Sequence, residues 1–356
     1  LSQQIFPPLG KRPALPHPMR FVTQIPAQFL ALSILALPAL AADPAPKPIV
    51  TTALAEAGPD YLIQGEYAGS LDGHATGLQV IALGNASFKA VLFDGGLPGA
   101  GGNPSSRREL DGTTKDQETT FKNDSTLIAI RDGKAAVTLN GESPRKGTLL
   151  RIERKSPTLG EKPPAGAVVL FDGSNADHFQ GGRMSPEGFL MEGTSSIRKF
   201  GSHRLHIEFM TPFMPQARGQ GRGNSGVYYQ GRYETQVLDS FGLIGKNNET
   251  GGVYSIKDPA VNMCLPPLVW QTYDTDFTAA EYDAEGKKMK NARLTTRLNG
   301  VVVQDDTELP NITTAAPVKE GPDPGPLYLQ NHGNPVRFRN IWLVETPTSG
   351  TRASRP

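Results

Sequence analysis

The sequence contains a single cysteine, Cys264, and only two tryptophans among its 356 residues. One cysteine cannot form an intramolecular disulfide bond, so the chain must fold through its hydrophobic cores alone. Because no histidine lies near Cys264 in the sequence, we interpret it as a small buried side chain and not as a nucleophile. The sequence also lacks a His-x-x-x-His motif and any cysteine pair, which argues against a preformed zinc site.

The sequence also has no marked excess of either charge, because it contains 36 basic and 35 acidic residues. Three of the basic residues, Lys11, Arg12 and Arg20, lie in a leader that we expect to be removed, which leaves 33 basic (36 − 3) against 35 acidic residues. A net charge near −2, without a basic patch, argues against nucleic acid or an anionic membrane as the partner.

No apolar run is long enough to span a bilayer. The run from Phe29 to Leu37 follows Met19-Arg20 and precedes Ala39-Leu40-Ala41, a pattern typical of a secretory signal at residues 19–41 that is cleaved after Ala41. We interpret residues 1–18 as sequence upstream of the start at Met19. We therefore expect an exported protein, periplasmic or extracellular, with no membrane anchor.

Amphipathic helical patterns are nearly absent, and short β-forming runs separated by turn residues fill the chain. Residues 50–155 carry six such runs, which predict a small β-domain of unknown function. The proline-rich residues 156–166 break the pattern and are typical of a stiff linker. Strand patterns resume over residues 167–346 and predict an all-β sandwich or jelly roll. We expect residues 347–356 to form a disordered tail.

One expected strand, from Val227 to Leu238, has an unusual polar face. Its alternation directs five side chains outward: Tyr228, Gln230, Arg232, Glu234 and Gln236. Planar hydrogen-bonding groups beside an aromatic ring suit the hydroxyls and ring faces of sugars. An exposed Arg232–Glu234 ion pair, worth about 0 to 1 kcal/mol, would explain two of them. Five such residues on one strand favour a binding site.

The glycine-rich residues 218–226 precede this strand and lack the strand-to-helix context of a phosphate-binding loop. Their glycines favour a tight bend or a close approach of the backbone to a ligand, with Arg222 and Asn224 at the rim. Near the end of the chain, alternation directs Gln330 outward and places His332, the best histidine candidate, close to it.

The sequence leaves the cofactor and the oligomeric state open. Glu208, Glu234, Asp239 and a histidine could share a site that holds a divalent metal ion, but their positions in the sequence do not establish one.

Seven stretches follow one another in order within residues 168–345. They are Val169-Leu170-Phe171-Asp172-Gly173, Leu205-His206-Ile207-Glu208-Phe209, Asn224-Ser225-Gly226-Val227-Tyr228, Tyr233-Glu234-Thr235-Gln236-Val237-Leu238-Asp239, Trp270-Gln271-Thr272-Tyr273-Asp274, Leu298-Asn299-Gly300, and Leu329-Gln330-Asn331-His332-Gly333 through Arg339-Asn340-Ile341. Together they resemble the 3-keto-disaccharide hydrolase family, whose domain has a concanavalin- or laminin-G-like jelly-roll fold.

The resemblance implies cleavage of a glycosidic bond in a sugar whose 3-hydroxyl has been oxidised. A C3 ketone acidifies the C2 hydrogen, so that a base can remove it, and the enolate then expels the group at C1 before water adds. We hypothesise that Glu234 is the base and that His332 or Arg232 stabilises the oxyanion. Asp239 or Glu208 would assist the leaving group.

Two alternatives remain. The spacing Glu234-x-Gln236-x-x-Asp239 resembles the Glu-x-Asp-x-x-Glu of retaining laminarinase-like glycosidases, which use two carboxyls about 5 to 5.5 Å apart. Because Gln236 replaces the middle carboxylate and the last is a shorter Asp239, this direct mechanism is the weaker enzymatic hypothesis. A non-catalytic carbohydrate-binding module is the other alternative, since similar sandwiches often only bind.

Overall fold

The computed structural model describes residues 48–346, so the predicted upstream sequence, signal segment and tail lie outside the described part of the chain. Helix is scarce between residues 48 and 346, where α1 (Pro59–Ile63) accompanies three short 3-10 turns, η1 (Leu54–Glu56), η2 (Pro104–Ser106) and η3 (Gly219–Gly221). In this part of the chain no helix is both long and apolar enough to cross a membrane. The predicted all-β class is confirmed.

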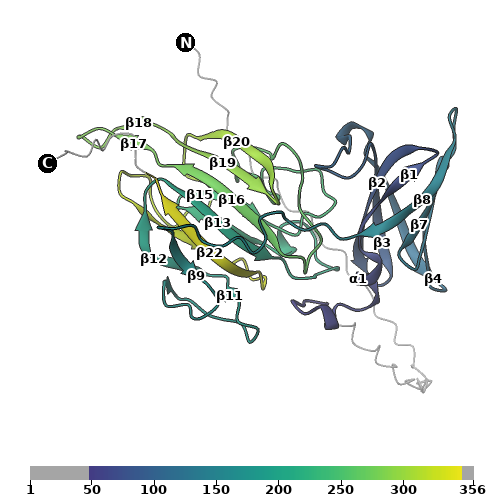
Figure 1. Cartoon of the computed structure of the whole chain (residues 1–356), viewed down its shortest axis with the longest axis horizontal. Helices are drawn as coiled ribbons and strands as arrows, with labels where there is room; N and C mark the ends of the chain where they lie inside the picture. Colours follow the sequence, from purple (N-terminus) through teal and green to yellow (C-terminus); the bar gives the residue numbers. More distant parts are fainter. Residues whose placement is uncertain (1–47, 347–356) are drawn as a thin grey trace, which may run out of the picture. The chain divides into compact units, whose positions relative to one another are not determined.

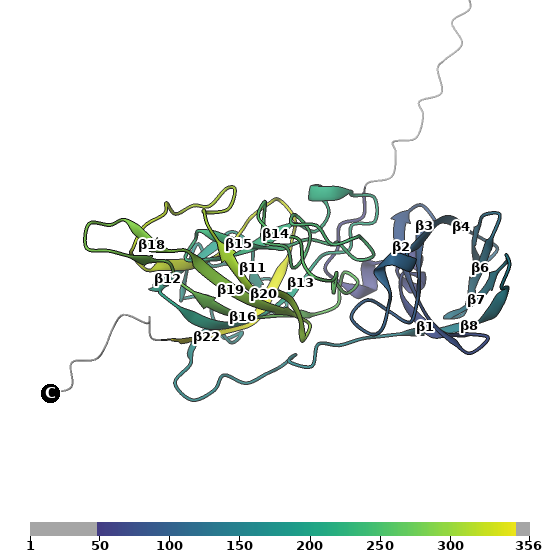
Figure 2. The ribbon, with the colours of Figure 1, turned by 90° about the horizontal axis from the view of Figure 1, so that it is seen from above.

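The first eight strands form a closed antiparallel barrel (Figures 1 and 2). Alternation fills its interior, because Ile128 and Ile130 are buried while Leu127 between Thr126 and Ile128 is exposed. Asp132 and Gly133 join two strands with φ angles of 49° and 69°, the left-handed conformation that tight hairpins require. The strands are β1 (Gly65–Leu71), β2 (His74–Gly84), β3 (Ser87–Asp94), β4 (Arg108–Lys115), β5 (Glu118–Lys122), β6 (Thr126–Arg131), β7 (Lys134–Leu139) and β8 (Arg145–Ile152).

The remaining strands form a sandwich of two antiparallel sheets. The five-stranded sheet has the order β10 (Phe179–Gln180), β12 (Thr194–Phe200), β21 (Gly325–Leu329), β14 (Ser225–Tyr229) and β15 (Tyr233–Val237). The seven-stranded sheet has the order β11 (Leu190–Met191), β22 (Arg337–Glu345), β13 (His203–Met210), β16 (Gln271–Thr278), β19 (Ala292–Leu298) and β20 (Val301–Leu309), and β9 (Val168–Phe171) pairs with β22. A separate hairpin joins β17 (Glu281–Tyr282) to β18 (Lys288–Lys290).

One hydrophobic core lies between the two sheets. Val227, Tyr229 and Tyr233 face it from the five-stranded sheet, and Leu205 and Ile207 face it from the seven-stranded sheet. The alternation of apolar and polar residues along each strand accounts for these inward orientations. The polar residues between them must therefore point to the outer face of their own sheet, and the two outer faces are on opposite sides of the core.

The sequence segment expected as one strand from Val227 to Leu238 is instead the hairpin β14–β15. Residues 230–232 connect the two strands, and the Arg232 N–H donates to the Tyr229 carbonyl at 3.0 Å. The two central residues of this β-turn, Gln230 and Gly231, have φ angles of 55° and 63°, a left-handed conformation that Gly231 adopts without strain. The hairpin shapes the site, because residues before the turn on β14 become cross-strand neighbours of residues after it on β15.

Residues 156–163, part of the predicted linker, lie along the outer face of the seven-stranded sheet, and we call them the strap. The Ser156 hydroxyl lies 2.6 Å from that of Thr272, and the Thr158 hydroxyl donates to Asp274 Oδ2 at 2.6 Å. Further along, the Gly160 N–H donates to Glu208 Oε1 at 2.6 Å. The strap is therefore fixed to the sheet by buried and half-buried polar groups.

Candidate functional site

The outer face of the five-stranded sheet carries a row of three polar or aromatic side chains at one register. Tyr328 on β21 is the partner of Tyr228 on β14, and Tyr228 is the partner of Glu234 on β15. The two tyrosine rings lie 5.3 Å apart between centroids. Cross-strand partners of this kind are close neighbours on a sheet face, so the row is one continuous surface.

Glu234 owes its position to a glycine on the neighbouring strand. A Cβ atom added to Gly226 would lie 2.0 Å from Glu234 Oε1, so any larger residue would displace the carboxyl group. Gly226 is the partner of Gln236, the next outward residue on β15. The missing side chain therefore opens a space within the sheet face, and the Glu234 carboxyl occupies it.

Glu234 is 2% exposed, and within residues 48–346 its carboxyl has a single side-chain hydrogen-bond donor. The Tyr228 hydroxyl donates to Glu234 Oε2 at 2.8 Å and also lies 3.1 Å from the Thr314 carbonyl. Burial raises the pKa of Glu234 to about 8, although the hydrogen bond from Tyr228 acts in the opposite direction. Near neutral pH this group can therefore both accept and return a proton.

Amide side chains extend the polar face on both sides of this pair. Gln330 Nε2 donates to the Tyr228 hydroxyl at 3.1 Å. On the other side, Gln236 Nε2 donates to Gln220 Oε1 at 3.0 Å. Gln330 and Gln220 are half-buried and so reach solvent, whereas Gln236 is buried. Gln330 thus connects the buried carboxyl, through Tyr228, to the molecular surface.

Residues 311–318 cover the edge of the face beside β15. The Thr313 hydroxyl accepts a hydrogen bond from the Glu234 N–H at 3.0 Å and donates to the Arg232 carbonyl at 3.1 Å. Thr314, which follows, is exposed and contributes the carbonyl that lies near Tyr228. This covering segment could not be identified from the sequence, because it is an irregular loop about 80 residues away from Glu234.

Asp239 and Arg222 form a buried ion pair with each other. Arg222 Nε donates to Asp239 Oδ2 at 2.6 Å, and both side chains are buried. Asn224 is buried nearby in the sequence, and its Oδ1 atom has no hydrogen-bond partner within residues 48–346. The Asp239 carboxylate is therefore already paired with Arg222, whereas the Asn224 side-chain oxygen could accept a hydrogen bond from a ligand or water.

Gln230 and Arg232 belong to the hairpin turn and not to the polar face. Arg232 Nε donates to the Lys319 carbonyl at 2.7 Å, and its Nη1 donates to the Asp323 carbonyl at 2.9 Å and to Gln230 Oε1 at 3.1 Å. Gln230 in turn donates to the Phe200 carbonyl at 3.1 Å. Both side chains hold loops in place, so Arg232 is already committed and is a poor candidate for an oxyanion partner.

Glu208 is not brought together with Glu234. It lies on β13, in the seven-stranded sheet, and contacts the strap, Arg339 and Asn340. Glu208 therefore does not share a metal site with Glu234 and Asp239, an arrangement that the sequence had left open. His332, the predicted histidine, is exposed in the loop after β21, two residues beyond Gln330.

The arrangement combines a proton-accepting carboxyl with neutral hydrogen-bond donors and an aromatic pair at the surface. Such a set suits a substrate that carries hydroxyl or carbonyl oxygens and loses a proton during the reaction. A β-sandwich with a face of this kind fits the class of carbohydrate-active domains.

Comparison with known proteins identifies the family. Residues 166–344, half of the chain, match the 3-keto-alpha-glucoside-1,2-lyase-like domain. The chain belongs to this family, as the seven sequence stretches predicted.

Several solved structures are each similar to about half of the chain. A candidate glycosyl hydrolase from Parabacteroides distasonis ATCC 8503 is 30% identical, with 51% of this chain and 85% of that chain covered and a TM-score of 0.46. Two further candidate glycosyl hydrolases from that organism are 18% and 20% identical, with 51% of this chain and 94% and 99% of theirs covered and TM-scores of 0.37 and 0.36. No curated protein matches the sequence.

Proposed function

We propose that the sandwich cleaves the glycosidic bond of 3-keto-glycosides, with Glu234 as the base that removes the C2 proton. The observation that carries this proposal is the buried Glu234 carboxyl, whose pKa near 8 suits a base that works around neutral pH. Family membership supports the substrate class, since a 1,2-lyase-like domain eliminates across C1 and C2.

In the proposed reaction the Glu234 carboxylate takes the proton from C2, and the C–H electrons form an enolate with the C3 carbonyl. The enolate then re-forms the ketone as the C1–O bond breaks, and the departing oxygen takes up a proton. Water adds across the resulting C1=C2 double bond and completes the hydrolysis. The enolate oxygen carries the developing charge, so a hydrogen-bond donor near it should accelerate the first step.

Two donors beside Glu234 could meet that charge. The Tyr228 hydroxyl and the Gln330 amide are already linked to each other and to the carboxyl. Both groups are neutral, so neither adds the charge attraction by which a nearby cation would lower the pKa of Glu234 further. Because Glu234 is buried, a substrate can reach its carboxyl only if neighbouring groups move; residues 311–318, whose Thr314 carbonyl lies 3.1 Å from the Tyr228 hydroxyl, are one such neighbour.

A deuterium-exchange assay tests the proposal directly. We expect the protein to exchange the C2 hydrogen of a 3-keto-disaccharide in D₂O and to release free sugar, both followed by NMR. Glu234→Gln should lose both activities by at least about 1,000-fold, because the amide cannot accept the proton. Glu142→Gln, which removes an exposed carboxylate in the barrel, is the matched control and should behave as wild type.

The outcomes separate the candidate functions. Sugar release without C2 exchange, or equal release from the unoxidised disaccharide, would support a direct two-carboxylate glycosidase instead. Binding without turnover by both wild type and Glu234→Gln would identify a carbohydrate-binding module and overturn the proposal.

A further inference from the structure

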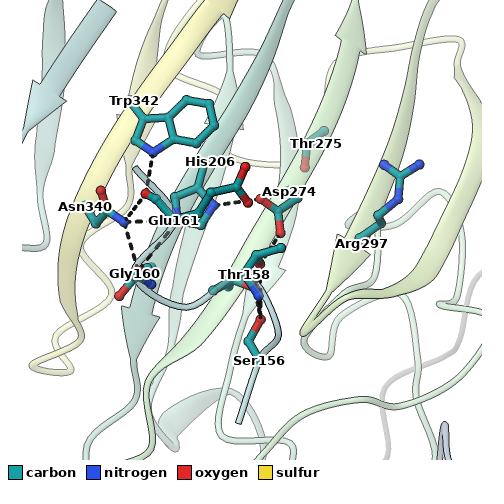
Figure 3. Close-up of polar contacts among 12 residues, drawn as sticks. Ser156, Thr158, Gly160, Glu161, His206, Asp274, Thr275, Arg297, Asn340 and Trp342 are labelled. Atoms are coloured by element: carbon teal, nitrogen blue, oxygen red, sulfur yellow. Dashed lines mark hydrogen bonds and ion pairs between the residues drawn. The ribbon is translucent and has the colours of Figure 1, made fainter. Parts of the chain in front are cut away.

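A second polar cluster lies on the opposite side of the sandwich, between the seven-stranded sheet and the strap (Figure 3). Glu161 comes from the strap, His206 from β13 and Asp274 from β16. One ligand-type atom from each of the three side chains lies within 4.8 Å of the other two. Three elements distant in the sequence thus bring one imidazole and two carboxylates to one point.

The imidazole of His206 is held in a fixed orientation. It stacks on Trp342, with ring centroids 5.0 Å apart and an interplanar angle of 17°. Its Nδ1 atom lies 2.7 Å from Asp274 Oδ1, and its Nε2 atom lies 3.6 Å from Glu208 Oε1. A histidine that ligates a metal through one nitrogen commonly directs the other toward a carboxylate in this way.

The supporting groups around these residues are themselves anchored. Arg339 Nε donates to Glu208 Oε2 at 2.6 Å, and Asn340 Nδ2 donates to Glu208 Oε1 at 3.0 Å. The Thr158 hydroxyl donates to Asp274 Oδ2 and leaves Oδ1 directed at His206. The orientation of the imidazole and of both carboxylates beside it therefore does not depend on an ion being bound.

The Glu161 carboxylate is the group without an assigned role. Within residues 48–346 no hydrogen bond or ion pair engages it, although its backbone carbonyl accepts from Trp342 Nε1 at 3.2 Å. It lies beside the Asp274 carboxylate, so two negative groups share the single imidazole of His206. Glu208, the third carboxylate, is paired with Arg339. An additional positive charge here would balance the repulsion between the Glu161 and Asp274 carboxylates.

Solvent can reach the Glu161 side of this cluster. Glu161 is half-buried and lines a cavity of about 360 Å³, together with Glu208, Arg339 and Asn340. A hydrated ion could therefore approach from the cavity without opening the hydrophobic core.

We propose that Glu161, His206 and Asp274 form a binding site for a divalent transition-metal ion, which fastens the strap to the sandwich. The ion would replace the proton on His206 Nδ1, and that proton would leave to solvent. One imidazole with two carboxylates suits Zn²⁺ better than Mg²⁺, which prefers oxygen ligands and retains its waters. Three protein ligands leave a fourth position for water.

The geometry needs only a small adjustment. Ligand atoms around tetrahedral zinc lie roughly 3.3 Å apart, given metal–ligand bonds of about 2.0 to 2.2 Å. The His206–Asp274 pair must open from 2.7 Å, and Glu161 must close from at most 4.8 Å. Rotation of the free Glu161 side chain supplies most of this movement.

Zinc binding to the chelator-treated full chain tests the proposal, measured by isothermal titration calorimetry and by metal analysis after dialysis. We expect wild type to bind one Zn²⁺ per chain, with a rise in melting temperature, and to bind Mg²⁺ at least about 100-fold more weakly. Glu161→Gln should weaken zinc binding at least about tenfold. It should fold normally, since its carboxylate makes no hydrogen bond within the described residues.

Two further variants complete the test. His206→Gln should also lose zinc binding. Asp276→Asn is the control and should retain it, because Asp276 lies on β16 with Asp274 but pairs with Arg297 at 3.2 Å. Absence of stoichiometric zinc binding by wild type would overturn the proposal. Equal binding by wild type and Glu161→Gln would place the zinc elsewhere and would also overturn it.

Discussion

Two glutamates on the same sandwich show how burial and hydrogen bonding set the charge of a side chain. Burial raises the pKa of Glu234 to about 8, and only Tyr228 opposes it. Burial also acts to raise the pKa of Glu208, but donors from His206, Asn340, Arg339 and the strap outweigh it and lower the value to about 2. Glu208 is therefore ionised throughout the physiological range and structural, whereas Glu234 can exchange a proton.

The pH dependence of activity should follow Glu234. A base must be deprotonated to act, so kcat/KM should rise about tenfold per pH unit below 8 and level off above it. Tyr228→Phe removes the hydrogen bond that lowers this pKa, so its rate profile should shift to higher pH. Steady-state kinetics between pH 5 and 10 would reveal this, and a profile that is flat below pH 7 would contradict it.

A single methyl group at Gly226 should disable the same carboxyl. Gly226→Ala places a Cβ 2.0 Å from Glu234 Oε1 and forces the carboxyl out of its position. Because a shift of about 1 Å can cost roughly 100-fold in rate, we expect a loss of at least that size in kcat. Gly201→Ala, whose added Cβ meets nothing within 4 Å, is the control and should retain full activity. Equal rates for the two variants would exclude Glu234 from the reaction.

At the scale of elements, the β14–β15 hairpin determines which polar residues share a face. Its turn at Gln230 and Gly231 separates Tyr228 from Glu234 in sequence and makes them cross-strand partners. The turn also directs Arg232 toward the loop at residues 319–323, where it binds backbone carbonyls. A continuous strand would have placed all five predicted residues on one face, and the hairpin divides them into a site and its support.

Replacing the turn glycine should therefore destabilise the sandwich. Gly231 has a φ of 63°, and a Cβ there would lie 2.6 Å from Val318 Cγ2. We expect Gly231→Ala to lower the free energy of unfolding by about 2 to 4 kcal/mol, from left-handed strain and overpacking together. Gly286 is the control: its φ is 80°, but a Cβ there would meet nothing within 4 Å. Gly286→Ala should therefore lower the free energy of unfolding by only about 1 to 2 kcal/mol. Urea unfolding of both variants would measure the difference, and equal losses would show that Val318 moves aside freely.

At the scale of the whole molecule, the sandwich uses its two outer faces differently. The five-stranded sheet presents the half-buried amides that lead to Glu234, while the strap covers the seven-stranded sheet. In Figure 2 strands β14 and β15 belong to one layer and β16 and β22 to the other. The proposed reaction and the proposed metal site thus lie on opposite sides of one hydrophobic core, and each can be tested without disturbing the other.

Export is the prediction that concerns the chain as a whole. We propose that residues 19–41 direct the protein out of the cytoplasm and that cleavage follows Ala41. Expressed in a Gram-negative bacterium, the protein should accumulate in the periplasm or medium with Ala42 as its first residue. Intact mass spectrometry of the fractionated cells would establish this. A cytoplasmic protein that keeps residues 19–41 would contradict it.

The sequence by itself determined the all-β class and the family, because strand alternation, turn residues and short motifs can be identified locally along the chain. It also identified Tyr228, Glu234 and Gln236 as outward residues. The sequence did not reveal the turn at Gln230 and Gly231. Gly231 was the only turn-forming residue at its two central positions, and a lone glycine also occurs within strands.

The tertiary structure alone decided which polar groups meet. Glu208 and Glu234 are both outward residues on their strands, yet they lie on opposite faces because their strands belong to different sheets. Thr313 reaches Glu234, and Glu161 reaches His206, across long stretches of chain. Alternation fixes the side of a strand on which a residue lies, but only sheet order and loop packing determine what lies opposite it.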